Sequence, residues 1–277
     1  MRTLNIIGGG HVGRVFGRLY ATIAAAGLQP QDVLTRSMPS AQLAADFIGA
    51  AACRPVDGYA QLRRADVYLL AVGDDQIAPA CAALAAAVPL RDAIVFHCSG
   101  ALPSGHLDAA RAAGAHVASV HPIRSFADPA AVAAQFAGTF CGVEGDAAAL
   151  AVLVPALEAI GARPVPIDAA AKTVYHAAAV FASNYLVTVL DAALRAYQAA
   201  GIPEPLAREM AQPLASEAMA NVFRLGAATA LSGPVARGDM ATVERQRRAM
   251  QDWDAATGEL YRALVAPTVA LAARKQR

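Results

Sequence analysis

Four polar side chains lie close together in an otherwise apolar segment, and together they could move a proton and orient a carbonyl group. Lys172 and His176 are four residues apart, so they share one face of a helix. On a regular helix Ser183 would point in nearly the same direction as Lys172, and Asn184 is its neighbour in the sequence. An ammonium, an imidazole, a hydroxyl and a carboxamide can donate protons and hydrogen bonds to a reacting carbonyl. We therefore predict catalytic roles for Lys172, His176 and Asn184, and a substrate contact for Ser183.

A structural interpretation of the first two residues stays open. Lys172 suits a solvated position in the first turn of a helix, and His176 suits a core histidine with satisfied hydrogen bonds. Taken singly, each structural role is more common than catalysis. On one apolar helix that directly follows a nucleotide domain, the two interpretations carry about equal weight.

A loop near the C-terminus carries two further charged candidates. The segment Ser232–Asp239 combines turn-forming residues with Arg237 and Asp239. Arg237 could hold a substrate carboxylate through two parallel hydrogen bonds, and Gly233 and Gly238 allow close approach of the backbone. We predict that Arg237 and Asp239 bind substrate. The alternative is a connecting loop in which Asp239 caps the next helix.

A glycine-rich loop lies between an expected strand over 3–7 and an expected helix over 12–26. Its glycines have the G-x-G-x-x-G spacing of dinucleotide-binding proteins. The first permits a tight turn, the second lets the backbone approach a pyrophosphate, and the third lets helix and strand pack closely. The helix N-terminus offers free N–H groups to phosphate. The alternative is a glycine-rich turn without a ligand. The predicted cofactor contacts are Gly8, Gly10, His11, Val12 and Gly13.

The residues after the expected second strand, over 33–35, favour NADP(H). Arg36 and Ser37 stand where an NAD site usually has an acidic residue, and Asp32 lies at the opposite end of that strand. A guanidinium and a hydroxyl suit a ribose 2′-phosphate, which a carboxylate would repel. We predict that Arg36 and Ser37 contact the cofactor. The alternative is that Arg36 is a solvated loop residue.

Polar residues and glycines follow the next three expected strands, over 66–72, 93–98 and 116–120. Ligands of open α/β sheets bind beyond the carboxyl ends of the strands, so these residues face the ligand crevice. Ser99 is equally suited to a turn or a helix cap. The predicted cofactor contacts here are Val72, Gly73, Asp74 and Ser99, and the predicted substrate contacts are Ser99, Gly100 and His121.

The elements that must position these residues change in type near residue 168. Up to 167, short apolar runs alternate with alanine-rich helical segments, which predicts βαβ units, with an edge strand over 163–167 because of its prolines. Beyond 168 the pattern is helical, with helices expected over 170–200, 206–228 and 244–274, the last interrupted by Pro267. We predict an α/β fold with a Rossmann-type, doubly wound, mostly parallel sheet in residues 1–168, followed by an all-α domain in residues 169–277.

Composition excludes several classes of protein. The chain of 277 residues is 56% hydrophobic and 16% charged, so it is not globally disordered. A net charge of +1 gives no electrostatic footprint for nucleic acid. The four cysteines have no metal-binding spacing, so we expect reduced thiols and no metal. The apolar run over 177–190 contains Ser183 and Asn184 and is short for a bilayer, and we expect no signal peptide before the first strand. We expect a cytoplasmic protein without membrane partners.

The helical domain is apolar on more than one helix face, as over 177–181. A helix that is apolar all round must be buried, and a domain of this length has limited room to bury three such helices. We therefore expect a homodimer that forms through the helical domain.

The motifs together resemble a family of bacterial proteins classed as oxidoreductases, in which a Rossmann-like domain precedes a helical domain of unknown function. The glycine loop, 35–37, 97–100, 121–123, 175–184 and 232–239 carry the resemblance, which spans nearly the whole chain. It implies NADP binding and a dimer, and a layout similar to pyrroline-5-carboxylate reductase, ketopantoate reductase and the β-hydroxyacid dehydrogenases. The last group has a proton-donating Lys followed four residues later by Asn. Here Lys172 is present, but His176 stands in place of that Asn.

We conclude that the sequence predicts an NADP(H)-dependent oxidoreductase that transfers a hydride to or from a small carbonyl, imine or hydroxy-acid compound in an interdomain cleft. Lys172 would exchange the proton, with His176 as its partner or replacement, Asn184 as an orienting group and Arg237 as a clamp for a substrate carboxylate. A dimeric NADP(H)-binding sensor without catalytic activity is the competing hypothesis.

Overall fold

A computed structural model describes residues 1–275, which divide into two compact units. The first unit is Met1–Val180, and the second begins at Phe181 and includes the remaining described residues. The division falls after Val180 rather than after Asp168, because the first helical turns beyond the last strand pack on the sheet through Lys172 and Tyr175.

The first unit is built on one eight-stranded sheet with the order β3-β2-β1-β4-β5-β6-β7-β8. All neighbouring strands are parallel except β6 and β7, which pair antiparallel. The chain therefore winds outward in both directions from β1 and β4, so the predicted Rossmann-type, mostly parallel sheet is confirmed. The strands are β1 (Arg2–Ile7), β2 (Leu28–Leu34), β3 (Arg54–Val56), β4 (Val67–Leu70), β5 (Ile94–His97), β6 (His116–Pro122), β7 (Phe140–Gly145) and β8 (Arg163–Pro166).

Helices cover both faces of this sheet, and each face has its own apolar cluster. Leu4 and Ile6 of β1 belong to the first cluster, whereas Ile7 belongs to the second. Because side chains alternate across a strand, a strand covered on both faces reads as a continuous apolar run. The first cluster includes residues of α1, α2 and α6, and the second includes residues of α3 and α4. The helices are α1 (His11–Thr22), α2 (Met38–Ile48), α3 (Asp74–Ala87), α4 (Asp108–Ala112), α5 (Pro129–Ala134), α6 (Ala147–Ala159) and α7 (Lys172–Val180).

Two predicted boundaries near the N-terminus are wrong. The first helix ends at Thr22 instead of residue 26, and a 3₁₀ turn (Ala24–Ala26) and a left-handed Gly27 follow it. The second strand begins at Leu28 instead of residue 33. Polar residues interrupt its apolar pattern, and the structure satisfies them individually. Buried Asp32, for example, accepts hydrogen bonds from Arg63 and Arg54.

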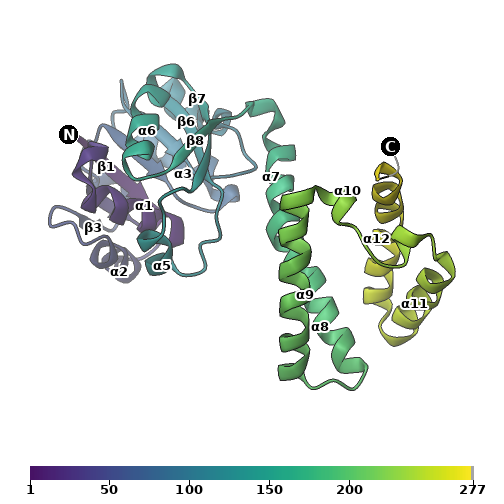
Figure 1. Cartoon of the computed structure of the whole chain (residues 1–277). Helices are drawn as coiled ribbons and strands as arrows, with labels where there is room; N and C mark the ends of the chain where they lie inside the picture. The colour runs from purple at the N-terminus through teal and green to yellow at the C-terminus, as the bar shows by residue number, and fades with distance from the viewer. Residues whose placement is uncertain (276–277) are drawn as a thin grey trace. The chain divides into compact units, whose positions relative to one another are not determined.

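The second unit is helical throughout its described residues. A π-helical turn (Phe181–Tyr185) leads into α8 (Leu186–Ala199), which pairs with α9 (Glu204–Leu225), and α11 (Met240–Trp253) packs on α12 (Ala255–Arg274). A short α10 (Ala227–Ala230) and a 3₁₀ turn (Val235–Arg237) lie between these pairs. Figure 1 shows both pairs as antiparallel hairpins.

The predicted helices of this unit exist, but three details were wrong. The helix expected over 206–228 is divided into α9 and α10 at Gly226, whose φ is +81°. The helix expected over 244–274 is two helices, because extended Asp254 ends α11 and caps α12 through the Ala256 N–H. Pro267 lies inside α12 without interrupting it.

The helical stretch Ala169–Ala199 corrects one expectation about membranes. By length and composition alone it is long and apolar enough to cross a bilayer, with a mean hydropathy of 1.5. One helix of this kind is weak evidence of a membrane span, so it does not assign the chain to a membrane. A buried ion pair at its Lys172 fastens the start of the stretch to the sheet.

Candidate functional site

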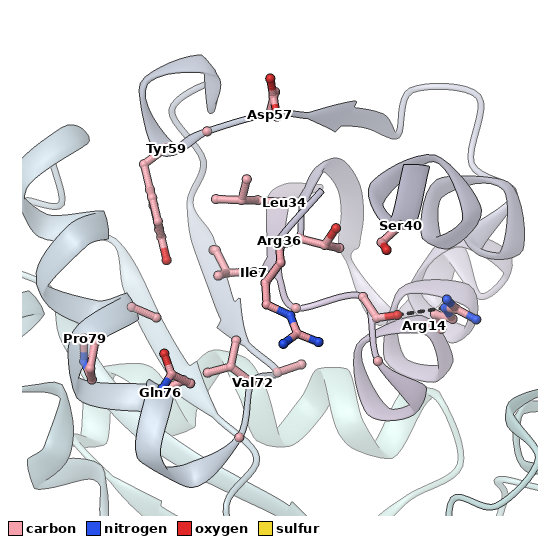
Figure 2. A pocket seen from close by; sticks show the side chains of 18 of the residues that line it. Ile7, Arg14, Leu34, Arg36, Ser40, Asp57, Tyr59, Val72, Gln76 and Pro79 are labelled. Atoms are coloured by element: carbon pink, nitrogen blue, oxygen red, sulfur yellow. Dashed lines mark hydrogen bonds between the residues drawn. The ribbon is translucent and has the colours of Figure 1, made fainter. Parts of the chain in front are cut away.

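A cavity of about 1000 Å³ opens at the carboxyl ends of β1, β2 and β4. This is the position at which a doubly wound sheet binds its ligand. In Figure 2, Tyr59 and Gln76 lie on one side of the cavity and Ser40 and Arg14 on the other, with Arg36 between them. The cavity is lined by Ile7, Gly8, Gly9, Gly10, Arg14, Leu34, Thr35, Arg36, Ser40, Asp57, Gly58, Tyr59, Ala71, Val72, Gly73, Asp75, Gln76, Pro79 and Ala80.

The three glycines of the loop differ in what surrounds them. Gly8 has a φ of +106°, and a Cβ there would lie 2.2 Å from the Ala71 carbonyl oxygen. A Cβ on Gly13 would lie 2.1 Å from the Gly8 carbonyl oxygen, so helix and loop touch through bare backbone. Gly10 is the N-cap of α1, and it has no side chain that could hydrogen-bond to the first N–H groups of the helix. The space where its Cβ would stand is open. The loop thus leaves the N-terminus of α1 accessible from the cavity, as phosphate binding requires.

Arg36 is the cationic side chain at the centre of the cavity. Its guanidinium extends into the hollow beside Ile7 and Val72 in Figure 2. The other lining arginine, Arg14, is held at the edge, where its Nε donates a 2.8 Å hydrogen bond to the Gly9 carbonyl. Asp32 does not line the cavity, since it is fully buried and paired with Arg63.

The structure places the predicted cofactor residues in two groups. Gly8, Gly10, Arg36, Val72 and Gly73 line the cavity. The others lie outside its lining, although two of them stand at helix starts: Ser37 is the N-cap of α2, and Asp74 is the first residue of α3. The predicted cofactor residues outside the lining are His11, Val12, Gly13, Ser37, Asp74 and Ser99.

A second polar cluster lies at the carboxyl end of β6, where α7 packs on the sheet. His121 Nδ1 and the Tyr175 hydroxyl are 2.9 Å apart, and the His121 and His176 rings meet edge to face with centroids 5.4 Å apart. Two glycines make room for these rings. A Cβ on Gly100 would lie 2.3 Å from His176 Nδ1 and 2.8 Å from His121 Nε2, and a Cβ on Gly142 would lie 2.4 Å from the Tyr175 oxygen.

Two members of this cluster, His121 and Tyr175, are uncharged at pH 7. Burial lowers the pKa of His121 to about 4, and the adjacent His176 and Lys172 act in the same direction. Burial raises the pKa of Tyr175 to about 12. His176 Nδ1 is buried without a hydrogen-bond partner in the described structure, which is an uncommon and costly condition for a polar atom. The predicted substrate residues His121 and Gly100 thus meet the predicted catalytic residue His176 here.

Lys172 lies beneath this cluster in a buried ionic network. Its Nζ is 3.2 Å from Glu144 Oε1 of β7 and also donates to the Ser119 hydroxyl of β6. Ser104 donates both its N–H and its hydroxyl to the same carboxylate, each at 2.7 Å. Lys172 has no exposed surface, and burial lowers its pKa while Glu144 opposes that shift. The ammonium therefore acts inside the protein, which conflicts with the expectation of direct proton exchange with a substrate.

His97 and Ser99 close the other side of this network. His97 Nδ1 accepts a 3.1 Å hydrogen bond from the Ser99 N–H, so its Nε2 carries the proton and faces the Pro103 carbonyl. Burial lowers the pKa of His97 to about 4. The Ser99 hydroxyl accepts hydrogen bonds from the Ala101 and Leu102 N–H groups. Ser99 therefore stabilises a turn, which was the structural alternative to its predicted ligand contact.

The remaining predicted residues lie in the second unit. Ser183 and Asn184 are part of the π-helical turn, where α-helical spacing no longer predicts which residues share a face. Arg237 is exposed at the end of a 3₁₀ turn. Asp239 caps α11 by accepting a 3.0 Å hydrogen bond from the Thr242 N–H, which is the capping role that the sequence left open.

Sequence reasoning missed several members of the two clusters: Tyr175, Glu144, Ser119, Ser104 and His97. Glu144 did carry a signal, because it is an isolated carboxylate within the apolar run over 140–145. A buried carboxylate needs a positively charged or hydrogen-bonding partner, so its presence in this strand indicated that such a partner packs against it. Among residues 1–275, no group of three or more His, Cys, Asp or Glu side chains is arranged to hold a metal ion.

Comparison with known families shows a recognised domain in the second half of the chain. Residues 139–268 match DUF2520, a domain of unknown function. The matched segment begins next to β7 and contains Glu144, Lys172, Tyr175 and His176. A comparison with curated protein sequences gave no match.

Solved structures share the fold over nearly the whole chain. Protein TM1727 from Thermotoga maritima is 27% identical, with a TM-score of 0.72 over 99% of this chain and 100% of that chain. The putative NADP oxidoreductase BF3122 from Bacteroides fragilis is 20% identical, with a TM-score of 0.77 over 97% and 98%. An imine reductase from Myxococcus stipitatus, solved with NADP⁺, is 16% identical, with a TM-score of 0.62 over 98% and 93%. The predicted resemblance to a Rossmann-like domain followed by a helical domain of unknown function is confirmed.

Proposed function

We propose that this chain, a Rossmann-type domain joined to a DUF2520 helical domain, is an NADP(H)-dependent oxidoreductase that acts on a small carbonyl or imine compound. The observation that carries the proposal is the cavity at the carboxyl ends of β1, β2 and β4, which combines the glycine loop with Arg36. The imine reductase that shares this fold was solved with NADP⁺, which supports the choice of cofactor.

The residues of the cavity fit a dinucleotide. Gly10 leaves open space in front of the α1 N-terminus, where unpaired N–H groups can bind a pyrophosphate. Arg36 can pair with a ribose 2′-phosphate, for which a guanidinium is well suited. A volume of about 1000 Å³ is at the upper end of the range for cofactor sites. When bound, NADPH would supply the hydride of the reaction.

The substrate side of the proposed site is the cluster at the end of β6. The cavity occupies the β1, β2 and β4 side of the sheet edge, and β5 and β6 continue that edge on the other side of β4. A dinucleotide that spans the switch point extends along this edge, so its reactive end would lie toward His121 and Gly100. His121, Tyr175 and His176 are the groups that would meet a substrate there.

Lys172 is a positioning residue in this proposal. Its ion pair with Glu144 and its hydrogen bond to Ser119 hold the first turn of α7 against β6 and β7. Tyr175 and His176 follow within the same helix, so the pair fixes where their side chains stand. The roles predicted for Ser183, Asn184, Arg237 and Asp239 stay predictions.

The second unit is also proposed to form a homodimer. It exposes several large apolar side chains, including Phe223 at 90%, Phe181 at 69% and Val187 at 65%. Exposed apolar surface of this extent is typical of protein interfaces. Multi-angle light scattering should give twice the mass of one chain, and Phe223→Glu should shift the mass toward that of one chain. A wild-type protein that stays monomeric at high concentration would contradict the dimer.

A fluorescence titration with NADPH, and with NADH in parallel, tests the cofactor. We expect NADPH to bind at least tenfold more tightly, a difference of about 1.4 kcal/mol. Binding of neither nucleotide would remove the basis of the proposed function. Binding of NADPH without oxidation by any aldehyde, ketone or imine would favour the sensor hypothesis.

A further inference from the structure

We propose that Tyr175 and His121 form a proton relay that serves the reduction of a carbonyl compound, with the Tyr175 hydroxyl donating to His121 Nδ1 and His121 Nε2–H donating to the substrate oxygen. This inference rests on the proposed function, since it assigns the proton donor and the substrate class of that reaction. It replaces direct proton donation by Lys172, whose ammonium has no exposed surface.

The first step of the argument is the contact between the two side chains. Tyr175 and His121 come from α7 and β6, and their hydroxyl oxygen and Nδ1 are 2.9 Å apart. Two glycines make this approach possible. Gly142 has no Cβ to hold the phenol away from the sheet, and Gly100 has none to displace either imidazole. Larger residues at both positions would prevent this packing.

The direction of the hydrogen bond follows from the surroundings of the phenol. The Tyr175 oxygen lies against Gly142, and the phenol keeps its proton at neutral pH because burial raises its pKa to about 12. His121 Nδ1 is 2.9 Å away, and the relay takes it as the acceptor of that proton. A neutral imidazole that accepts at Nδ1 carries its proton on Nε2, so His121 presents a donor at the end of β6.

The titration behaviour of the pair excludes the usual imidazolium donor. The groups that face His121 are Tyr175, His176 and Lys172 from α7, and Tyr175 is faced in addition by Cys141 of β7. Burial and these neighbours lower the pKa of His121 to about 4 and raise that of Tyr175 to about 12. At neutral pH the imidazole has one proton, so the proton that it gives away must be replaced by the phenol.

The relay balances for a carbonyl substrate. When bound, the reduced nicotinamide of the proposed function would supply a hydride to the carbonyl carbon, so that the electron pair of the C=O π bond moves to oxygen. The oxygen then takes the Nε2 proton of His121, while Nδ1 takes the phenolic proton of Tyr175. His121 ends as its other neutral tautomer, and Tyr175 ends as a tyrosinate that water reprotonates. An alkoxide is a much stronger base than a tyrosinate, so the transfer runs downhill.

A protonated imine fits the same cluster poorly. An iminium already carries its proton and a positive charge, and it needs no donor. The Lys172 ammonium is a positive charge that acts on His121, and neither His121 nor Tyr175 supplies a negative charge at pH 7. A neutral carbonyl group is therefore the better match.

Nitrogen-edited NMR of the histidine side chains tests the relay directly in the full-length protein, without substrate. We expect wild-type His121 to be the Nε2–H tautomer from pH 5.5 to 8.5, and Tyr175→Phe to remove that preference or to raise the His121 pKa by more than one unit. Tyr197→Phe, which changes a phenol in the second unit, is the matched control. An Nδ1–H tautomer in the wild type, or a His121 that titrates near 6.5, would overturn the proposal.

Turnover and binding separate this inference from the proposed function. Tyr175→Phe and His121→Asn should bind NADPH within about twofold of wild type by fluorescence, yet reduce ketones and aldehydes at least 100-fold more slowly, chiefly in kcat. Cyclopentanone and 1-pyrroline are a matched pair of probes, and the ketone should be reduced faster. Preference for the imine, or unchanged kcat in both variants, would refute the relay, whereas a wild type that binds no NADPH refutes the proposed function instead.

Discussion

The Lys172 ammonium and the Glu144 carboxylate form a buried ion pair, 3.2 Å apart, that joins the first turn of α7 to the C-terminal end of β7. Both side chains are almost completely shielded from solvent, at 1% and 6% exposure. The carboxylate also accepts two hydrogen bonds from Ser104, so its charge is well compensated. This pair sets the position of the helix that carries Tyr175 and His176.

Lys172→Met should destabilise the first unit by about 3–5 kcal/mol, because it leaves the Glu144 carboxylate buried without a counter-charge. Urea denaturation followed by circular dichroism measures the change. The double variant Lys172→Met, Glu144→Gln removes both charges and should recover at least half of the loss. Equal stability of Lys172→Met and wild type would show that the pair is not buried as described.

Arg36→Ala should weaken NADPH binding about tenfold, or ~1.4 kcal/mol, and change NADH binding by less than threefold. The reason is that the guanidinium enters the cavity where a 2′-phosphate would lie. Arg64→Ala, at an exposed arginine outside the cavity, is the control and should bind both nucleotides like wild type. An equal loss for both nucleotides in Arg36→Ala would place the arginine elsewhere than at the 2′-phosphate.

Gly10→Ala and Gly8→Ala should separate binding from folding. Gly10 has a φ of −71° and open space where a Cβ would stand, so alanine should change the free energy of unfolding by less than about 0.5 kcal/mol while lowering NADPH affinity at least tenfold. Gly8 has a φ of +106° and would clash with the Ala71 carbonyl, so alanine should cost about 1–3 kcal/mol or more. Thermal denaturation and the fluorescence titration give the two readouts. Normal NADPH affinity in Gly10→Ala would argue that the pyrophosphate does not approach this loop.

Stability should decrease as the pH falls from about 6.5 to about 4. Burial lowers the folded-state pKa of His97 and His121 to about 4, whereas the unfolded chain binds these protons near pH 6.5. In that interval the unfolded state carries more protons, so each histidine contributes a slope of up to about 1.4 kcal/mol per pH unit. Urea titrations between pH 4 and 8 measure this slope, and His121→Asn should reduce it.

The sequence by itself determined the features that depend on short stretches of chain. The glycine loop with its strand and helix, the alternation of apolar strands and helices up to residue 167, and the helical second half all follow from local patterns of residue type. Capping at Asp239 and the turn at Ser99 were available from the sequence as alternatives to the predicted ligand contacts, because each involves hydrogen bonds to residues two or three positions away.

The tertiary structure decided which of the polar residues meet. Tyr175 lies 54 residues from His121 along the chain, and Lys172 lies 28 residues from Glu144, so no local pattern connects them. Spacing placed Lys172 and His176 on one helix face, yet the packing of α7 on an antiparallel β7 buried the first and left the second beside His121. A buried charge is stable only beside a partner, and the register of β6 with β7 is what supplies Glu144 at that point.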